Sequence, residues 1–172
     1  MCGRYNFSKE SSSELVQAVL ENLQSRQIEV KTGEVFPGDV AAVIASNRKL
    51  EPQAFGMKWG YQLPDGKLIF NARSETAVQK AMFADGMRQR RCLVPADSYY
   101  EWQKTGQGKQ KYEIAPAVRQ IILCKRISTN SRISRLQCAG LGLIPLVYSF
   151  PGGWDGMRAL RGVNTVPVSR EP

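Results

Sequence analysis

The 172-residue sequence contains no histidine, and this absence restricts the chemistry open to it. Structural and catalytic zinc sites are built mainly from histidine and cysteine, and the four cysteines show no Cys-x-x-Cys spacing. We therefore expect no metal site and no bound cofactor.

Long apolar runs are missing as well. No stretch approaches the roughly 20 apolar residues that a bilayer span needs, and charges such as Arg4 and Glu14 interrupt the start before a signal-peptide core could form. We expect a protein with no membrane partner, located in the cytoplasm, or with the nucleoid if the source is bacterial. In that reducing compartment Cys92, Cys124 and Cys138, which have apolar neighbours, are interpreted as small core residues.

Acidic residues are scarce in the last third of the chain. Residues 118–172 hold eight Lys+Arg and two Asp+Glu, whereas the first 117 residues hold 16 and 13, and the formal net charge is +9. Such an excess favours a polyanionic partner such as nucleic acid over an acidic small molecule, although it also serves solubility.

The length and the apolar content of 42% predict one globular domain over residues 1–172. A capping-box pattern at 11–14 with apolar residues at helical spacing predicts a helix over 11–25. A second helix is expected over 75–88, capped by Ser74, with Ala77, Val78, Ala81 and Met82 as its buried face. The expected strands cover 40–45, 55–61, 67–71, 92–95, 98–103 and 111–115, with a hairpin tip at 106–108. Because no βαβ rhythm is present, the fold class is α+β, a compact and mostly antiparallel β domain with a few flanking helices.

The cysteine at position 2 is the first candidate for chemistry. If Met1 is removed, Cys2 carries a free α-amine beside its thiol, and these two nucleophiles on adjacent carbons can do what an internal cysteine cannot. The alternative is an incidental cysteine in a frayed terminus.

Three internal clusters are further candidates. Asn71 begins the run Asn-Ala-Arg-Ser-Glu at a strand-to-helix junction, where polar groups can converge on an anion or a carbonyl, or can simply cap the helix. Glu101 lies between Tyr100 and Trp102, where burial would raise its pKa into a range useful for acid–base work, unless it is an exposed strand carboxylate. The Lys-Trp-Gly-Tyr run that contains Trp59 could stack bases beside arginines, or place a tryptophan in the core.

Five motifs occur in a fixed order: MCGRY at the start, the Phe-Pro loop, KWGY, NARSET and RCLVPADSYYEW. In this order they resemble the SRAP family, the SOS response-associated peptidase or abasic-site-processing proteins, over nearly all of residues 1–116. The resemblance implies a thiol peptidase or hydrolase of DNA damage repair and the SOS response. It implies a monomer whose cationic groove binds single-stranded DNA with abasic sites and crosslinks to them through the N-terminal cysteine. The implied catalytic residues are Cys2 as nucleophile with Asn71 and Glu101 as partners, and the implied DNA-binding residues are Arg4, Pro37, Trp59, Arg73 and Trp102.

The implied crosslink makes chemical sense of a cysteine at position 2. An α-amine with a pKa near ~8 is partly neutral at pH 7 and can add to the aldehyde of a ring-opened abasic sugar to form a Schiff base. The neighbouring thiol then closes a five-membered thiazolidine ring. In this scheme Glu101 could move protons, and Asn71 could orient the amine or the sugar oxygens.

The sequence departs from the family at one catalytic position. Members carry a histidine in an H-x-R-M-P-like segment, and Leu141 stands in its place here, while residues 118–140 match no family segment that we recognise. Because general acid–base help is worth about 10² to 10⁴ in rate, we expect a slower crosslinking reaction and not a lost one.

Two other functions remain open from the sequence. A class II glutamine amidotransferase also begins Cys-Gly in its mature form and uses its own α-amine as a base. A non-covalent single-strand binding module that has lost its chemistry is the second. Release of ammonia from glutamine, or a DNA complex that survives only under native conditions, would distinguish these from a crosslinking protein.

Overall fold

The computed structural model describes residues 3–89, 91–106, 108–116, 122–128, 143–147 and 163–168. These residues form two main sheets in which every strand pair is antiparallel except β7 with β12. The five-stranded sheet has the order β13 (Val163–Pro167), β10 (Gly108–Pro116), β9 (Ser98–Thr105), β1 (Arg4–Phe7) and β2 (Gly33–Val35). The six-stranded sheet has the order β4 (Pro52–Lys58), β3 (Val40–Ser46), β8 (Arg91–Ala96), β11 (Ile122–Ser128), β12 (Leu143–Val147) and β7 (Ala72–Arg73).

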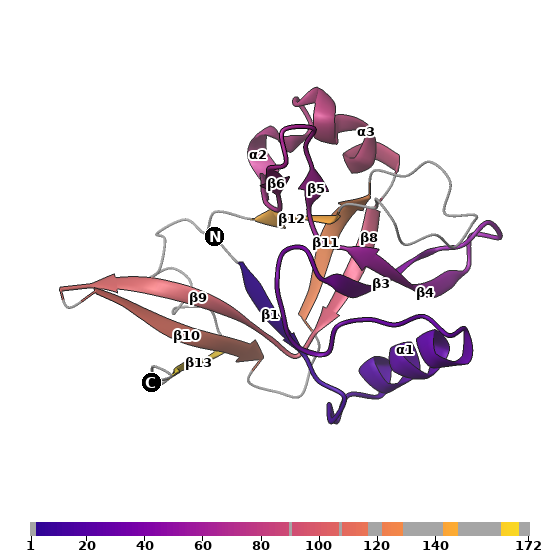
Figure 1. The fold of residues 1–172 in the computed structure, drawn as a ribbon. Coiled ribbons are helices and arrows are strands. Elements are labelled where there is room, and N and C mark those ends of the chain that lie inside the picture. The colour runs from indigo at the N-terminus through magenta and orange to yellow at the C-terminus, as the bar shows by residue number, and fades with distance from the viewer. Residues whose placement is uncertain are drawn as a thin grey trace.

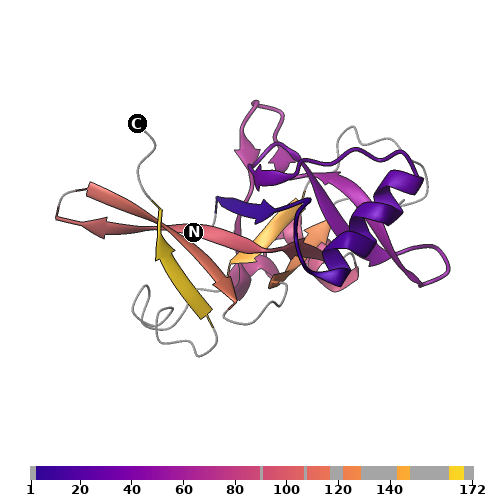
Figure 2. The same cartoon turned by 90° about the horizontal axis from the view of Figure 1, so that it is seen from below.

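Three helices and a small two-stranded sheet complete the described structure: α1 (Glu14–Ser25), α2 (Ser74–Ala77), α3 (Ala81–Gln89), β5 (Tyr61–Gln62) and β6 (Leu68–Ile69). Figure 1 shows α1 beside the β3–β4 hairpin, with α2 and α3 above the sheets together with β5 and β6. In both Figure 1 and Figure 2 the β9–β10 hairpin extends away from α1 and from the β3–β4 hairpin. The predicted α+β class, mostly antiparallel with few helices, is confirmed. No helix in the described part of the chain is long and apolar enough to cross a bilayer.

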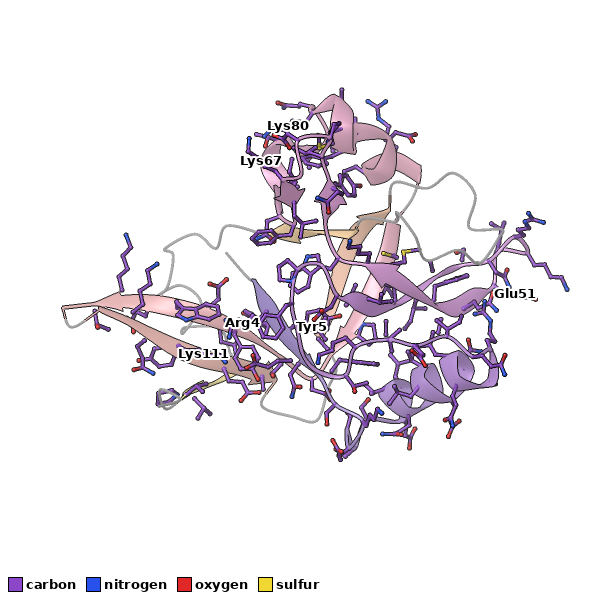
Figure 3. All side chains as sticks on the ribbon, in the orientation of Figure 1. Arg4, Tyr5, Glu51, Lys67, Lys80 and Lys111 are labelled. Atoms are coloured by element: carbon purple, nitrogen blue, oxygen red, sulfur yellow. The ribbon has the colours of Figure 1, made fainter. Side chains whose placement is uncertain are left out.

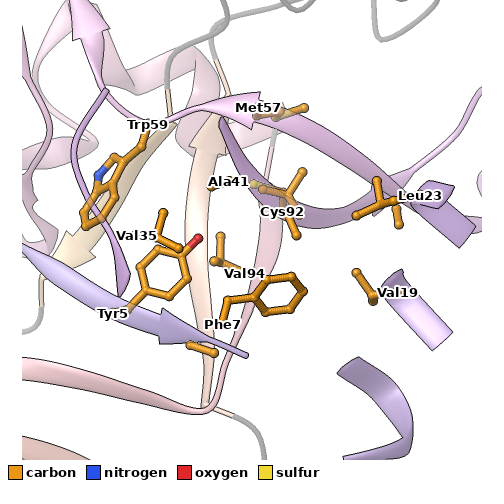
Figure 4. Close-up of a cluster of buried hydrophobic side chains, with 14 of the residues drawn as sticks. Tyr5, Phe7, Val19, Leu23, Val35, Ala41, Met57, Trp59, Cys92 and Val94 are labelled. Atoms are coloured by element: carbon orange, nitrogen blue, oxygen red, sulfur yellow. The ribbon is translucent and has the colours of Figure 1, made fainter. Parts of the chain in front are cut away.

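The main core lies between α1, the β1–β2 end of the five-stranded sheet and the strands β4, β3 and β8 of the six-stranded sheet. Figure 4 shows Tyr5 and Phe7 from β1 facing Val94 and Cys92 of β8, with Trp59 beside Tyr5. Phe7 and Trp59 are fully buried, and the burial of each such side chain contributes a few kcal/mol to stability. This core fixes the position of β1, and therefore of the start of the chain.

The first helix is shorter than its sequence pattern predicts. It begins at Glu14 with Ser13 as its N-cap residue, and Ser11 lies in the loop before it. The hydroxyl of Ser11 donates a hydrogen bond to the carboxylate of Asp97, which also accepts one from the backbone N–H of Ser8 at 2.8 Å. Ser11 therefore fastens the loop to the turn between β8 and β9 and is not part of a capping box.

The single helix expected over 75–88 is wrong in two respects. The chain forms α2 and α3 separately, and Ser74 is the first residue of α2 and not its cap. The carbonyl of Lys80 accepts hydrogen bonds from the backbone N–H groups of Phe83 and Ala84, so α3 begins as a separate helix. Val78 and Met82 are therefore about half exposed, at 45% and 47%. Ala77 is buried as predicted, and Phe83 is buried instead of Val78 and Met82.

The strand expected over 55–61 is also displaced. It runs from Pro52 to Lys58, and the chain turns at Gly60 before Tyr61 enters β5. Gly60 has φ +109°, and a Cβ at this position would lie 2.7 Å from Leu68 Cδ1, so only glycine fits. Similarly, the segment expected as one strand over 67–71 pairs only at β6.

Candidate functional site

The start of β1 brings a cation and aromatic rings together at the surface. The guanidinium carbon of Arg4 lies 4.5 Å from the ring centre of Phe36 and 5.4 Å from that of Trp102. Arg4 is opposite Tyr100 in the β1–β9 register, and side chains two residues apart on a strand share a face, so Trp102 lies on the same face. The Arg4 side chain is 37% exposed and Trp102 is partly exposed, so both are accessible to a ligand. Cation–π contacts of this kind hold the guanidinium in place over the two rings.

The loop that carries Pro37 is held by hydrogen bonds of the residues on both sides of it, Phe36 and Gly38. The Asp39 carboxylate accepts a hydrogen bond from the backbone N–H of Phe36 at 2.9 Å, and the N–H of Gly38 donates to the carbonyl of Trp59 at 2.7 Å. Pro37 is partly buried between these two anchors and follows directly on the ring that contacts Arg4. The structure thus groups Pro37, Arg4 and Trp102 around one patch of surface.

Trp59 does not line that surface. Its side chain is 0% exposed, its ring centre lies 5.5 Å from that of Tyr5, and its indole N–H donates to the carbonyl of Phe70 at 3.1 Å. The expectation that Trp59 contacts DNA is therefore corrected, because the ring reaches no solvent. Its place is beneath the site, where it fixes β1 on one side and the Phe70–Asn71 segment on the other.

Asn71 follows the residue that Trp59 holds. Its side-chain oxygen Oδ1 is buried. A Cβ added to Gly3 would lie 4.0 Å from the ring of Phe70, so the first described residue of the chain packs directly against this segment. The structure thereby places the beginning of the chain beside the segment that carries Asn71.

Glu101 lies on β9, opposite Tyr112 of β10, and is partly exposed. By strand alternation it projects from the face opposite to that of Arg4 and Trp102. Because Arg4 is opposite Tyr100, extending the β1–β9 register by one residue places Gly3 opposite Glu101. Among the predicted catalytic residues, Glu101 therefore lies near the point where β1 begins, on the face of the sheet opposite to that of Arg4 and Trp102.

Three residues of the expected site cannot be placed. Cys2 and Leu141 lie outside the described residues. The backbone of Arg73 is in β7, opposite Val147 of β12, but its side chain is outside the description. Their roles remain predictions. Of the other cysteines, Cys92 is buried as predicted, Cys124 lies in β11 with its side chain undescribed, and Cys138 is outside the described residues.

A pair of charged residues that the sequence did not single out supports Arg4. The Glu34 carboxylate accepts from Lys111 at 2.5 Å and lies 3.5 Å from the Arg4 guanidinium. Lys111 Nζ in turn lies 4.1 Å from the ring centre of Tyr100. Figure 3 shows Arg4 and Lys111 close to one another at the base of the β9–β10 hairpin. No sequence signal could reveal this cluster, since Glu34 and Lys111 are 77 positions apart.

Within the described residues no group of three or more histidine, cysteine, aspartate or glutamate side chains is placed to hold a metal ion.

Burial raises the pKa of Tyr100 to about 12, with further contributions from the carboxylates of Glu113 and Glu34. In the unfolded chain Tyr100 has the ordinary tyrosine pKa of 10.0. Below pH 10 the folded and the unfolded chain both keep the proton, so the contribution of Tyr100 to the free energy of unfolding has its full value. Between pH 10 and 12 only the unfolded chain releases it, and the free energy of unfolding should fall as the pH rises. We expect this alkaline loss to be smaller in Tyr100→Phe, measured by chemical denaturation of both proteins across that pH range. Parallel curves would contradict the assignment.

Comparisons with known proteins identify relatives of this chain. The sequence model of "SOS response associated peptidase (SRAP)" matches residues 1–145. The chain is 28% identical over 109 residues to the abasic site processing protein YoqW of Bacillus subtilis, covering 60% of this chain and 49% of that protein. It is 29% identical over 138 residues to the abasic site processing protein YedK of Escherichia coli, covering 76% of this chain and 60% of that protein. The chain thus spans about half the length of the curated relatives it matches.

Solved structures show the same fold. A phage-related protein from Bordetella bronchiseptica superposes with a TM-score of 0.69 at 22% identity, over 99% of this chain and 95% of that one. A second protein from the same organism superposes with a TM-score of 0.68 at 17% identity, over 98% and 100% of the two chains. The fold and the family match together define the class, an α+β domain of the SRAP type. The chain belongs to the SOS response associated peptidase (SRAP) family.

Proposed function

We propose that this protein processes abasic sites in single-stranded DNA by forming a covalent thiazolidine crosslink through Cys2 after Met1 has been removed. The observation that carries the proposal is the Arg4 guanidinium, held against the rings of Phe36 and Trp102 two residues along the chain from Cys2. The names of the relatives in Bacillus subtilis and Escherichia coli support the same substrate class.

The crosslink forms in steps that balance. The neutral α-amine of Cys2 adds to the aldehyde carbon of the ring-opened sugar, and the resulting carbinolamine loses one water to give an imine. The thiol sulfur then adds to the imine carbon, while its proton passes to the nitrogen. One water is released overall, and no oxidant or reductant is needed. Proton transfer at the carbinolamine is the step that a positioned carboxylate accelerates.

The geometry around Gly3 supports roles for two further side chains. Gly3 packs against Phe70, next to Asn71, and the β1–β9 register leads to Glu101. We assign proton transfer to Glu101 and the orientation of the amine or sugar oxygens to Asn71.

We assign the binding of the DNA strand to the surface around Arg4. Arg4 binds a phosphate, Trp102 and Pro37 offer apolar surface on which unpaired bases can stack, and Arg73 adds a second cation. Stacking on an aromatic ring requires a base freed from its pair, which favours single-stranded substrate. Trp59 supports these residues from beneath. We extend the proposal to removal of Met1 by the protein itself, since the family is described as a peptidase.

The test is a denaturing gel. Purified protein is incubated with single-stranded DNA that carries one abasic site, and a shifted band that survives heating is expected. Cys2→Ala should eliminate the band, because both the thiazolidine sulfur and its ring are lost. Cys92→Ala, which removes a buried thiol, should keep it. An intact mass of the protein shows in the same sample whether Met1 is absent.

Three results would overturn the proposal. A complex seen only on native gels would indicate a non-covalent binding module. Ammonia release from glutamine without any crosslink would indicate an amidotransferase. A crosslink that persists in Cys2→Ala would assign the reaction to another nucleophile.

A further inference from the structure

Two lysines face each other near the tip of the β9–β10 hairpin. Lys104 and Lys109 are directly opposite in the register, and both are exposed. Like charges directly opposite one another destabilise an antiparallel pair by several tenths of a kcal/mol. The lysine pair therefore does not stabilise the hairpin, and an interaction with a partner molecule would explain why the two lysines lie there.

The lysine pair shares a face with the cation–aromatic surface. Side chains two residues apart on a strand project to the same side of the sheet. Lys104 therefore shares the face of Trp102 on β9, and Lys109 shares the face of Lys111 on β10. Trp102 and Lys111 are themselves opposite one another in the register. From the start of β1 outward, this one face thus presents Arg4 and Tyr100, then the Trp102–Lys111 pair, then the two lysines.

The two inner cations and the two outer ones differ in their partners. Glu34 forms ion pairs with both Arg4 and Lys111. Among the described residues, no carboxylate forms an ion pair with Lys104 or Lys109. The hairpin that carries them extends away from α1 and the β3–β4 hairpin in both views of the fold (Figures 1 and 2). The outer pair is thus a doubly charged site on a projecting arm, in line with the surface around Arg4.

We propose that Lys104 and Lys109 bind backbone phosphates of the DNA strand on one side of the reactive site, so that the β9–β10 hairpin extends the interface beyond the crosslinking centre. The inference rests on the proposed function for the identity of the polyanion. Successive cations on one face of a strand are about 6.8 Å apart, a repeat of the order of the phosphate spacing in an extended single strand. The repulsion between the two lysines is relieved when each of them binds a phosphate of the strand.

The experiment compares two double variants with the same net charge. Lys104→Gln with Lys109→Gln removes the outer pair, and Lys9→Gln with Lys49→Gln removes two exposed lysines elsewhere, Lys49 from the β3–β4 turn where Figure 3 labels Glu51. The affinity for an intact single-stranded oligonucleotide is measured by fluorescence anisotropy over a series of salt concentrations. Each phosphate contact contributes about 0.7 to the slope of log K against log salt for single strands. We expect the hairpin variant to lose about 1.4 of that slope and roughly tenfold in affinity near 0.1 M salt, and the control variant to keep both.

A second measurement separates this inference from the proposed function. Crosslinking of an abasic trinucleotide, too short to reach the hairpin tip, should proceed at the wild-type rate in the hairpin variant. The melting temperature of the hairpin variant should be equal to or higher than that of the wild-type protein, because the repulsion between the two lysines has been removed. Equal slopes for both variants would overturn the inference even if crosslinking occurs. A lost slope without any crosslink in the wild type would overturn the proposed chemistry and leave the hairpin site standing.

Discussion

Replacement of Glu101 by glutamine is expected to slow crosslink formation about 10²- to 10⁴-fold, since a positioned carboxyl group contributes this much to proton transfer. The amide has nearly the same shape, so the β9–β10 pairing with Tyr112 and the approach of the N-terminus are retained. Single-turnover rates with saturating protein measure the chemical step apart from DNA binding. The crosslink should still form, because the amine and thiol of Cys2 are unchanged.

Glu113→Gln is the matched control for this variant. Glu113 is a partly buried carboxylate on the neighbouring strand, and it faces the opposite side of the sheet, where it accepts a hydrogen bond from Ser98 at 2.5 Å. Its crosslinking rate under saturating conditions should equal that of the wild type. A Glu101→Gln protein that reacts as fast as Glu113→Gln would remove Glu101 from the mechanism.

Trp59→Ala is expected to destabilise the fold by about 3 to 5 kcal/mol, the usual cost of deleting a fully buried aromatic side chain. The ring is 0% exposed, contacts Tyr5, and gives the carbonyl of Phe70 its hydrogen bond, so a cavity and a lost donor arise together. Domains of this size are stable by only about 5 to 15 kcal/mol. The change therefore removes a large part of the total stability, which chemical denaturation measures.

The second tryptophan of the site provides the contrast. Trp102 is partly exposed on β9, so Trp102→Ala should leave the denaturation midpoint nearly unchanged. It should weaken the binding of single-stranded DNA by about 1 to 3 kcal/mol, the contribution of one stacked base. If Trp59→Ala proved as stable as Trp102→Ala, the assignment of Trp59 to the core would be wrong.

The sequence predicted the family and the strand that carries Glu101 and Trp102, but not the form of the second helix. Glu101 and Trp102 lie on a strand within the range expected for it, and the family assignment from the ordered motifs agrees with the match over residues 1–145. The second helix was predicted wrongly because the chain breaks between α2 and α3. The new helix begins with hydrogen bonds to the carbonyl of Lys80, and apolar spacing does not encode such a break. The expected site residues that lie outside the described structure are still untested.

The sequence alone determined the order of the motifs along the chain and predicted Cys2 as the reactive residue, because an α-amine beside a thiol has the same chemistry wherever the chain folds. Only the tertiary structure decided which of two tryptophans in similar motifs would turn inward. Trp59 follows β4 and its ring packs beside Tyr5 of β1 in the core, whereas Trp102 lies on β9 beyond the point where β1 begins. The tertiary structure likewise joined Glu34 to Arg4 and to Lys111, which are 30 and 77 positions away in the sequence. The physical reason is that local periodicity specifies alternation along a strand, while the register and the position of the core determine which side of that alternation meets solvent.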